Sequence, residues 1–196
     1  MLRCTHSCFL VEVKDDGCLQ DSFFGYYSGS QDYFQHTDRD ANNTIAFDLH
    51  LDEGSRCGKD CSQPQLHLKG NYSAGLFAQR ALAILDEHAQ EWLAHPLFIY
   101  AAFQSVHCPI QVPQKYVAPY LHLDPNRQQF AGMLAALDEA IGTVVDGFQS
   151  RGFWTNTLTV FTTDNGGPVG SIVDPKTGIP TPHGIGCATG SQNTPL

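Results

Sequence analysis

The stretch Thr159-Val-Phe-Thr-Thr-Asp-Asn-Gly-Gly167, near the end of the chain, decides how this sequence is interpreted. Its first residues are apolar or β-branched, which is typical of a strand buried in a sheet. The strand stops at two side chains that carry oxygen, Asp164 and Asn165, and two glycines then allow a tight turn. A carboxylate beside an amide oxygen suits a hard cation such as Ca²⁺ or Mg²⁺. An isolated Asp-Asn-Gly-Gly is more often an Asx turn, so the rest of the chain has to decide.

The bulk properties of the chain describe an ordinary globular protein. It has 196 residues, of which 42% are hydrophobic, enough for one domain with a sizeable core. The formal net charge of −9 argues against nucleic acid as a partner, because nucleic acid needs basic patches. No apolar run is long enough to be a transmembrane segment, and the first residues make no convincing signal peptide.

Seven cysteines and two glycosylation sequons bear on the compartment. The sequons begin at Asn42 and Asn71 and are compatible with the secretory route. Cys57 and Cys61 lie in a polar segment and could form a small loop disulfide or stay as free thiols. A zinc site with His67 is less favoured, because a second pair of ligands at finger-like spacing is missing.

Hydrophobic spacing predicts an alternation of strands and helices. Residues 73–92 have helical periodicity, with Phe77, Ala81 and Leu85 on one face, and Ser73 is a candidate N-cap. Residues 130–148 have a second apolar stripe that includes Leu134, and Gly152 is the predicted end of this helix. The continuous apolar run 97–103 and the run 157–163 are predicted strands, so the second helix lies in a βαβ unit with parallel strands. Residues 23–34 are predicted to form a packed aromatic loop, and residues 45–51 one short strand. The expected fold class is α/β.

His107 lies in the loop that follows the strand predicted at 97–103. Parallel strands end at the same edge of a sheet, so His107 is expected near Asp164 and Asn165. By itself, a histidine in a loop beside a proline is more often structural.

Several motifs in this order resemble the sulfatase family, and most closely its arylsulfatase B group. They are Phe24-Gly-Tyr-Tyr-Ser-Gly-Ser-Gln-Asp-Tyr-Phe-Gln-His36, Pro96-Leu-Phe-Ile-Tyr-Ala-Ala-Phe-Gln-Ser-Val-His-Cys-Pro109, Gln111-Val-Pro-Gln-Lys-Tyr116, Phe130-Ala-Gly-Met-Leu-Ala-Ala-Leu-Asp-Glu-Ala-Ile-Gly142 and Phe161-Thr-Thr-Asp-Asn-Gly-Gly167. The resemblance covers roughly residues 21–170 and implies a partial alkaline-phosphatase-like fold, with a mostly parallel sheet and flanking helices. Residues 1–20 are left unassigned, and residues 21–196 are expected to be a partial catalytic domain.

The resemblance also implies an activity and a set of site residues. Sulfatases hydrolyse sulfate esters with Ca²⁺ and a formylglycine made from cysteine. By motif, Asp164 and Asn165 match calcium ligands, and His107 matches the catalytic histidine that contacts the substrate sulfate. The substrate class would be an aryl sulfate or a sulfated glycan, including glycosaminoglycans, and the location lysosomal or extracellular.

The chain departs from the family pattern at the nucleophile. No cysteine lies in the expected Cys-x-Pro-x-Arg, and the early pair of metal-binding aspartates is also absent. Formylglycine is therefore not available here, and the calcium ligand set is incomplete. We expect an incomplete sulfatase chain that is inactive alone. The alternatives are a non-catalytic sulfatase-like binding protein or a metal-dependent phosphodiesterase of the same superfold.

Overall fold

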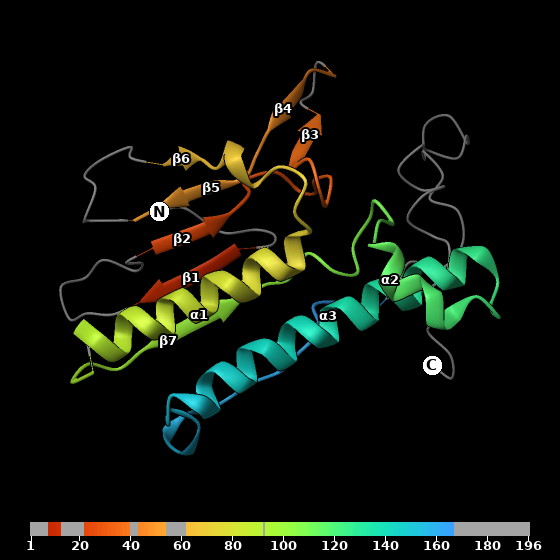
Figure 1. Cartoon of the computed structure of the whole chain (residues 1–196). Helices are drawn as coiled ribbons and strands as arrows, with labels where there is room; N and C mark the ends of the chain where they lie inside the picture. The colour runs from red at the N-terminus through yellow and green to blue at the C-terminus, as the bar shows by residue number, and fades with distance from the viewer. Residues whose placement is uncertain (1–7, 13–21, 40–42, 54–61, 92, 167–196) are drawn as a thin grey trace.

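The computed structural model describes residues 8–12, 22–39, 43–53, 62–91 and 93–166. Figure 1 shows a sheet with one long helix packed along it and a second long helix beside the first. The sheet has the strand order β6-β5-β2-β1-β7. Its strands are β1 (Cys8–Glu12), β2 (Ser22–Gly25), β5 (His50–Asp52), β6 (Gln63–Pro64) and β7 (Phe98–Ala101).

Every strand pair in the described part of this sheet is antiparallel. β1 pairs with β2 from Cys8↔Gly25 to Val11↔Ser22, and with β7 from Phe9↔Ala101 to Glu12↔Phe98. The prediction of a mostly parallel sheet is therefore not confirmed. β1, from the segment left unassigned, pairs with β7 in the antiparallel sense, and no described strand pairs with the other edge of β7.

The segment predicted as one strand at 45–51 is divided between two sheets. β4 (Ile45–Phe47) pairs with β3 (Thr37–Arg39), whereas β5 pairs with β2. The chain changes sheet at Asp48, whose carboxylate accepts hydrogen bonds from the backbone N–H groups of Tyr27 and Ser28 at 2.8–3.2 Å. The aromatic loop predicted at 23–34 likewise begins as strand β2, because the phenylalanines of β2 are buried against the core.

The first predicted helix is confirmed as α1 (Ser73–Glu91). Its buried face includes Phe77, Ala81 and Leu85, as the periodicity predicted, and Phe77 packs against Phe24 of β2. Ser73 is the first residue of the helix. Its hydroxyl donates to Gln104 Oε1 at 2.9 Å and so contacts the loop that follows β7.

The second predicted helix is confirmed and extended as α3 (Pro125–Ser150), which follows the short α2 (Gln114–Val117). Met133, Ala136 and Ala140 are buried, whereas Leu134, placed in the predicted stripe, is exposed. The small side chains on the buried face allow α1 and α3 to approach closely. Gly152 ends the helix with a φ of +78°, a conformation that glycine adopts without strain.

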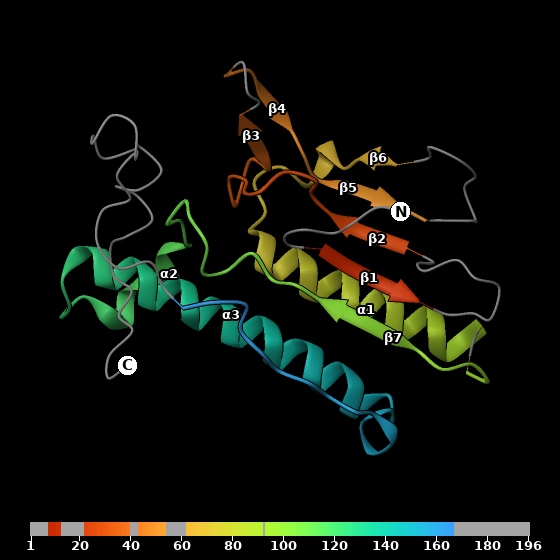
Figure 2. The same ribbon diagram turned by 180° about the vertical axis from the view of Figure 1, so that it is seen from behind.

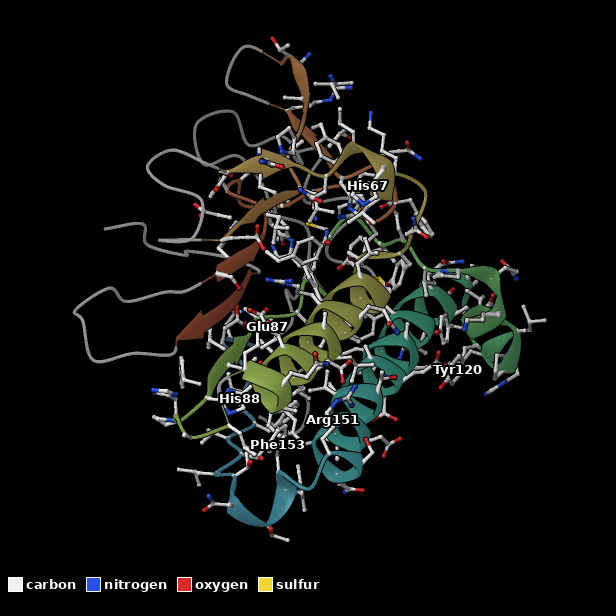
Figure 3. All side chains as sticks on the ribbon, turned by 60° about the vertical axis from the view of Figure 1, so that its left-hand side comes forward. His67, Glu87, His88, Tyr120, Arg151 and Phe153 are labelled. Carbon is white, nitrogen blue, oxygen red and sulfur yellow. The ribbon has the colours of Figure 1, made fainter. Side chains whose placement is uncertain are left out.

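The far ends of the two long helices are joined by side chains (Figure 3). Arg151 Nε donates to Asp86 Oδ1 at 2.8 Å, and Nη2 forms an ion pair with the same oxygen at 2.7 Å. The ring of His88 packs edge-on against Phe153, with centroids 5.6 Å apart. None of the described helices is both long and apolar enough to cross a bilayer.

The strand predicted at 157–163 is not formed in the described part of the chain. Residues 157–163 pair with no other described segment, and Figure 2 shows this part of the chain running along α3 in the same sense as β7. Leu158 and Phe161 are 91% and 80% exposed. The βαβ unit thus has its first strand and its helix, but not its second strand.

Candidate functional site

His107 is held at the surface in the loop that leaves β7. Its side chain is exposed, and its Nδ1 lies 2.8 Å from the carbonyl oxygen of Cys108. Its backbone N–H donates to the carbonyl of Gln104 at 2.9 Å, which closes a tight turn. Because a carbonyl can only accept, Nδ1 carries a proton, and Nε2 is the nitrogen left for a ligand.

Buried glutamine contacts fix the start of this loop. Gln104 is 2% exposed, and its Nε2 donates to the carbonyl of Gln31 at 2.6 Å. Its Oε1 accepts from the Ser73 hydroxyl at the start of α1. The residue before the turn is therefore anchored on two sides.

Asp32 and Gln111 anchor the far end of the loop. Gln111 Nε2 donates to Asp32 Oδ2 at 2.7 Å, while its Oε1 accepts from the backbone N–H of Tyr33 at 2.8 Å. Burial alone would raise the pKa of Asp32, but hydrogen bonds from the Gln35 amide, Gln111 and the Phe34 amide outweigh it and lower this pKa. The carboxylate thus stays ionised and keeps accepting from Gln111.

Asp164 and Asn165 lie at the surface in a turn with its own hydrogen bonds. Asp164 Oδ1 accepts from the Asn165 backbone N–H at 2.7 Å, and Asn165 Nδ2 donates to the Gly166 carbonyl at 2.8 Å. The Thr163 hydroxyl donates to the Asn165 carbonyl at 2.9 Å. An Asx turn would have Asp164 accept from the Gly166 N–H, two residues on, whereas the described bond comes from the next residue, so that alternative also stays a prediction.

The expected convergence of His107 with Asp164 and Asn165 remains a prediction. The ring of His107 bonds Cys108 and its backbone bonds Gln104 and Tyr33, whereas the hydrogen bonds described for the acid–amide pair stay within 163–166. Within the described ranges, no group of three or more His, Cys, Asp or Glu side chains could hold a metal ion. Ca²⁺ takes six to eight oxygen ligands, so the described residues do not by themselves make a calcium site.

The sequons have different positions relative to the described structure. Asn71 is exposed just before α1, and its Nδ2 donates to the Leu68 carbonyl at 3.1 Å. Asn42 and the pair Cys57 and Cys61 lie outside the described residues. Cys108 is disulfide-bonded.

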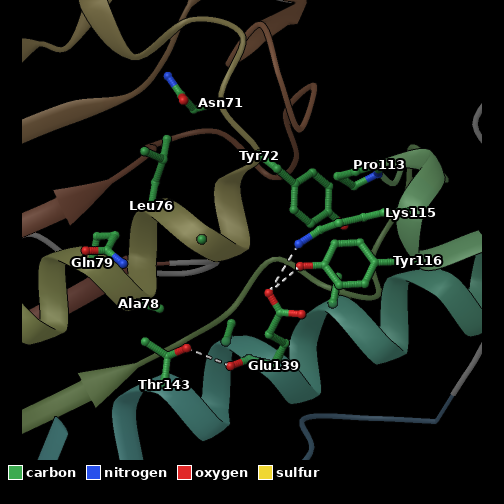
Figure 4. Close-up of a pocket in the computed structure, with 13 residues that line it drawn as sticks. Asn71, Tyr72, Leu76, Ala78, Gln79, Pro113, Lys115, Tyr116, Glu139 and Thr143 are labelled. Atoms are coloured by element: carbon green, nitrogen blue, oxygen red, sulfur yellow. Dashed lines mark hydrogen bonds and ion pairs between the residues drawn. The ribbon is translucent and has the colours of Figure 1, made fainter.

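A cavity of about 360 Å³ opens where α1, α2 and α3 meet (Figure 4). Glu139 from α3 accepts from the Tyr116 hydroxyl at 2.8 Å and from Lys115 Nζ at 3.3 Å. Asn71 is one of the residues that line the cavity. Of the site residues predicted from sequence, the cavity includes only Asn71.

The anchors of the His107 loop were missed by sequence reasoning. Asp32, Tyr33, Gln104 and Gln111 all occur in the motifs quoted above, but nothing local marks them as partners. Their contacts join positions more than 70 residues apart.

Comparisons with known proteins agree with the motif order. The sulfatase family model matches residues 13–194. Arylsulfatase J of Mus musculus is 35% identical over 148 residues, which cover 75% of this chain and 23% of that protein. N-acetylgalactosamine-6-sulfatase of Mus musculus is 27% identical over 92 residues, 46% of this chain and 16% of that protein. This chain therefore spans less than a quarter of the length of these relatives.

A solved structure supports the fold. The crystal structure of Ps i-CgsB in complex with k-i-k-neocarrahexaose matches 70% of this chain and 30% of its own, with a TM-score of 0.55. At 19% identity this similarity bears on the fold alone. With a family match across most of its length, the chain belongs to the sulfatase family.

Proposed function

We propose that this chain forms part of a sulfuric ester hydrolase in which His107 contacts the sulfate group. The observation that carries the proposal is the sulfatase match over residues 13–194, together with the 35% identity to arylsulfatase J. In the same proposal, Asp164 and Asn165 supply two oxygen ligands to Ca²⁺, and further ligands are needed to complete the site.

The chemistry of His107 follows from its hydrogen bond to Cys108. With Nδ1–H directed at the carbonyl, Nε2 is a lone pair in the neutral ring and an N–H donor in the protonated ring. A sulfate oxygen only accepts, so the protonated form binds it. When the S–O ester bond breaks, the same N–H can stabilise or protonate the leaving oxygen.

We propose that these 196 residues alone do not turn over a sulfate ester. Cleavage through a covalent intermediate needs a nucleophile, and the sequence contains no Cys-x-Pro-x-Arg from which formylglycine could be made. The same observation favours, as second candidate, a non-catalytic relative that binds sulfated ligands.

The proposed substrate class is a sulfated glycan, with an oxidising compartment such as the lysosome or the extracellular space. The glycan class is supported by the similarity to an N-acetylgalactosamine-6-sulfatase. The compartment is supported by the disulfide bond at Cys108 and by the exposed sequon at Asn71.

Two measurements on the full chain test the proposal. In the first, 4-nitrophenyl sulfate is titrated into protein with ¹³C-labelled histidine rings, and His107→Gln identifies the His107 signal. This signal should shift saturably as the ester is added. No response at His107, or an equal response to 4-nitrophenol, would refute the role in sulfate binding.

The second measurement follows 4-nitrophenol release over time. No release above a blank without protein is expected. Turnover that disappears in His107→Gln would instead show that the chain is active alone, and would overturn the proposed inactivity.

A further inference from the structure

We propose that Tyr33 is a positioning residue for His107, acting through the hydrogen bond from its phenol to the His107 carbonyl. The inference rests on the proposed function, because it concerns the position of the imidazole that is proposed to contact the sulfate. Tyr33 does not touch the imidazole ring itself. It acts on the backbone that carries the ring.

The ring of Tyr33 is fixed before it reaches the loop. Its side chain is fully buried and stacks on Tyr72, with centroids 5.3 Å apart and planes within 16°. Its backbone carbonyl accepts from the Ser73 N–H at 3.0 Å, which ties it to the start of α1. Its own N–H donates to Gln111. A phenol held in this way presents its oxygen at one defined point.

The phenol oxygen of Tyr33 lies close to the backbone carbonyls at both ends of the turn that carries His107. It is 2.7 Å from the His107 carbonyl and 3.0 Å from the Gln104 carbonyl. The Gln104 carbonyl also accepts from the His107 N–H. One hydroxyl proton therefore lies within hydrogen-bond distance of both carbonyls at the ends of the turn. Removing it takes away the described bond to the His107 carbonyl, while the side chain of Gln104 keeps its own anchors.

The hydroxyl keeps its proton under all ordinary conditions. Burial raises the pKa of Tyr33 well above its ordinary value, and the neighbouring Tyr72 and Tyr26 raise it further. The phenol therefore remains a hydrogen-bond donor to the carbonyls of the turn.

The test compares Tyr33→Phe with the matched control Tyr72→Phe. Both variants keep their aromatic ring and lose one hydroxyl that donates to a carbonyl of the same loop, but Tyr72 donates to Gln111, at 3.1 Å. The measurement is the NMR order parameter of the His107 N–H in the full chain. In Tyr33→Phe it should fall from about 0.85, the value of rigid backbone, to below about 0.6, the value of flexible backbone.

The controls separate positioning from a general loss of stability. The order parameter of His88 in α1 should stay near 0.85 in every variant, because it reports the native state and not the free energy of unfolding. His107 should remain rigid in Tyr72→Phe. A rigid His107 in Tyr33→Phe, or equal loosening in both variants, would overturn the proposal.

A measurement on the wild-type chain covers the case in which Tyr33→Phe does not fold. The Tyr33 hydroxyl proton should exchange slowly enough to be observed and should give a nuclear Overhauser effect to the His107 backbone. Exchange as fast as that of an exposed tyrosine would overturn the assignment.

A ligand titration distinguishes this inference from the proposed function. If 4-nitrophenyl sulfate binds at His107, its affinity should fall about tenfold in Tyr33→Phe, the effect of one lost hydrogen bond. If the wild type does not respond to the ester, the proposed function fails, and the order parameter still decides whether Tyr33 positions the loop.

Discussion

Two glycines in α3 provide a sharp test of how closely α1 and α3 pack. A Cβ atom built on Gly147 would overlap Leu82 Cδ2 of α1 and lie 3.3 Å from Leu85 Cδ1. A Cβ built on Gly142, in the same helix, meets nothing within 4 Å. Alanine at the two positions therefore adds the same atom in two different environments.

The expected energies follow from two opposing effects. In a helix, alanine is more favourable than glycine by about 0.8–1 kcal/mol. Overpacking at a close contact costs about 1–3 kcal/mol, and Leu82 is half-buried, so part of its side chain can move. Gly142→Ala should thus raise the free energy of unfolding by about 1 kcal/mol, whereas Gly147→Ala should lower it by about 1 kcal/mol.

Urea unfolding of the full chain measures both values, and the slope with denaturant should stay constant. The difference between the variants, about 2 kcal/mol, is the informative quantity, because helix propensity cancels in it. Equal stabilisation by the two alanines would show that α1 and α3 do not approach as described.

Three further predictions concern the core and its titrating groups. Phe77→Ala should lower the free energy of unfolding by about 3–5 kcal/mol in urea, because the ring is fully buried between α1 and the sheet. Asp48→Asn should cost about 1–3 kcal/mol, because the amide keeps one acceptor oxygen and puts an NH₂ donor where the other carboxylate oxygen accepts a backbone N–H. Burial would raise the pKa of Asp48, but its hydrogen bonds outweigh this effect and lower the pKa. The carboxylate therefore adds to the free energy of unfolding above the ordinary carboxyl pKa, and this contribution is lost on acidification. The wild type should thus lose more stability on acidification than Asp48→Asn. Burial raises the pKa of Tyr72 to about 12. Its contribution to the free energy of unfolding should therefore be intact below about pH 10 and be lost as the pH rises towards 12. Urea midpoints should show a smaller alkaline loss of stability in Tyr72→Phe than in the wild type.

The two long helices could be predicted because their signals are local. Phe77, Ala81 and Leu85 repeat at helical spacing and lie on the buried face of α1. Gly152 ended α3 as predicted, through a positive φ. The exposure of Leu134 was missed, because periodicity gives a face and leaves its exact rotation to the neighbouring helices.

The sheet was predicted less well because strand pairing is decided by distant partners. β1 comes from a segment with no clear period, yet it pairs with both β2 and β7. The run 157–163 has the composition of a buried strand, but composition cannot supply the neighbour that would cover Leu158 and Phe161. The register and the neighbours of a strand are therefore decided only when distant segments of the chain come together.

The candidate site shows the same division between local and distant information. The position of His107 after a strand was visible in the sequence, but the groups that hold its loop come from segments far along the chain. If His107 contacts sulfate as proposed, Tyr33 and Asp32 affect that contact without touching the ligand. A substitution at either position should alter binding by moving the loop that carries His107, without removing the imidazole itself.

The two halves of the proposed site differ in what fixes them. The His107 turn is held by buried side chains from the segment around Tyr33 and from α1, so its geometry exists before any ligand arrives. The hydrogen bonds described for Asp164 and Asn165 join only their immediate neighbours. A cation that binds the acid–amide pair would have to hold both side chains in place, and the conformational entropy lost in doing so weakens binding. The imidazole should thus bind sulfate at a geometry set by the fold, whereas the affinity of the acid–amide pair for Ca²⁺ should depend on how many further oxygens hold it in place.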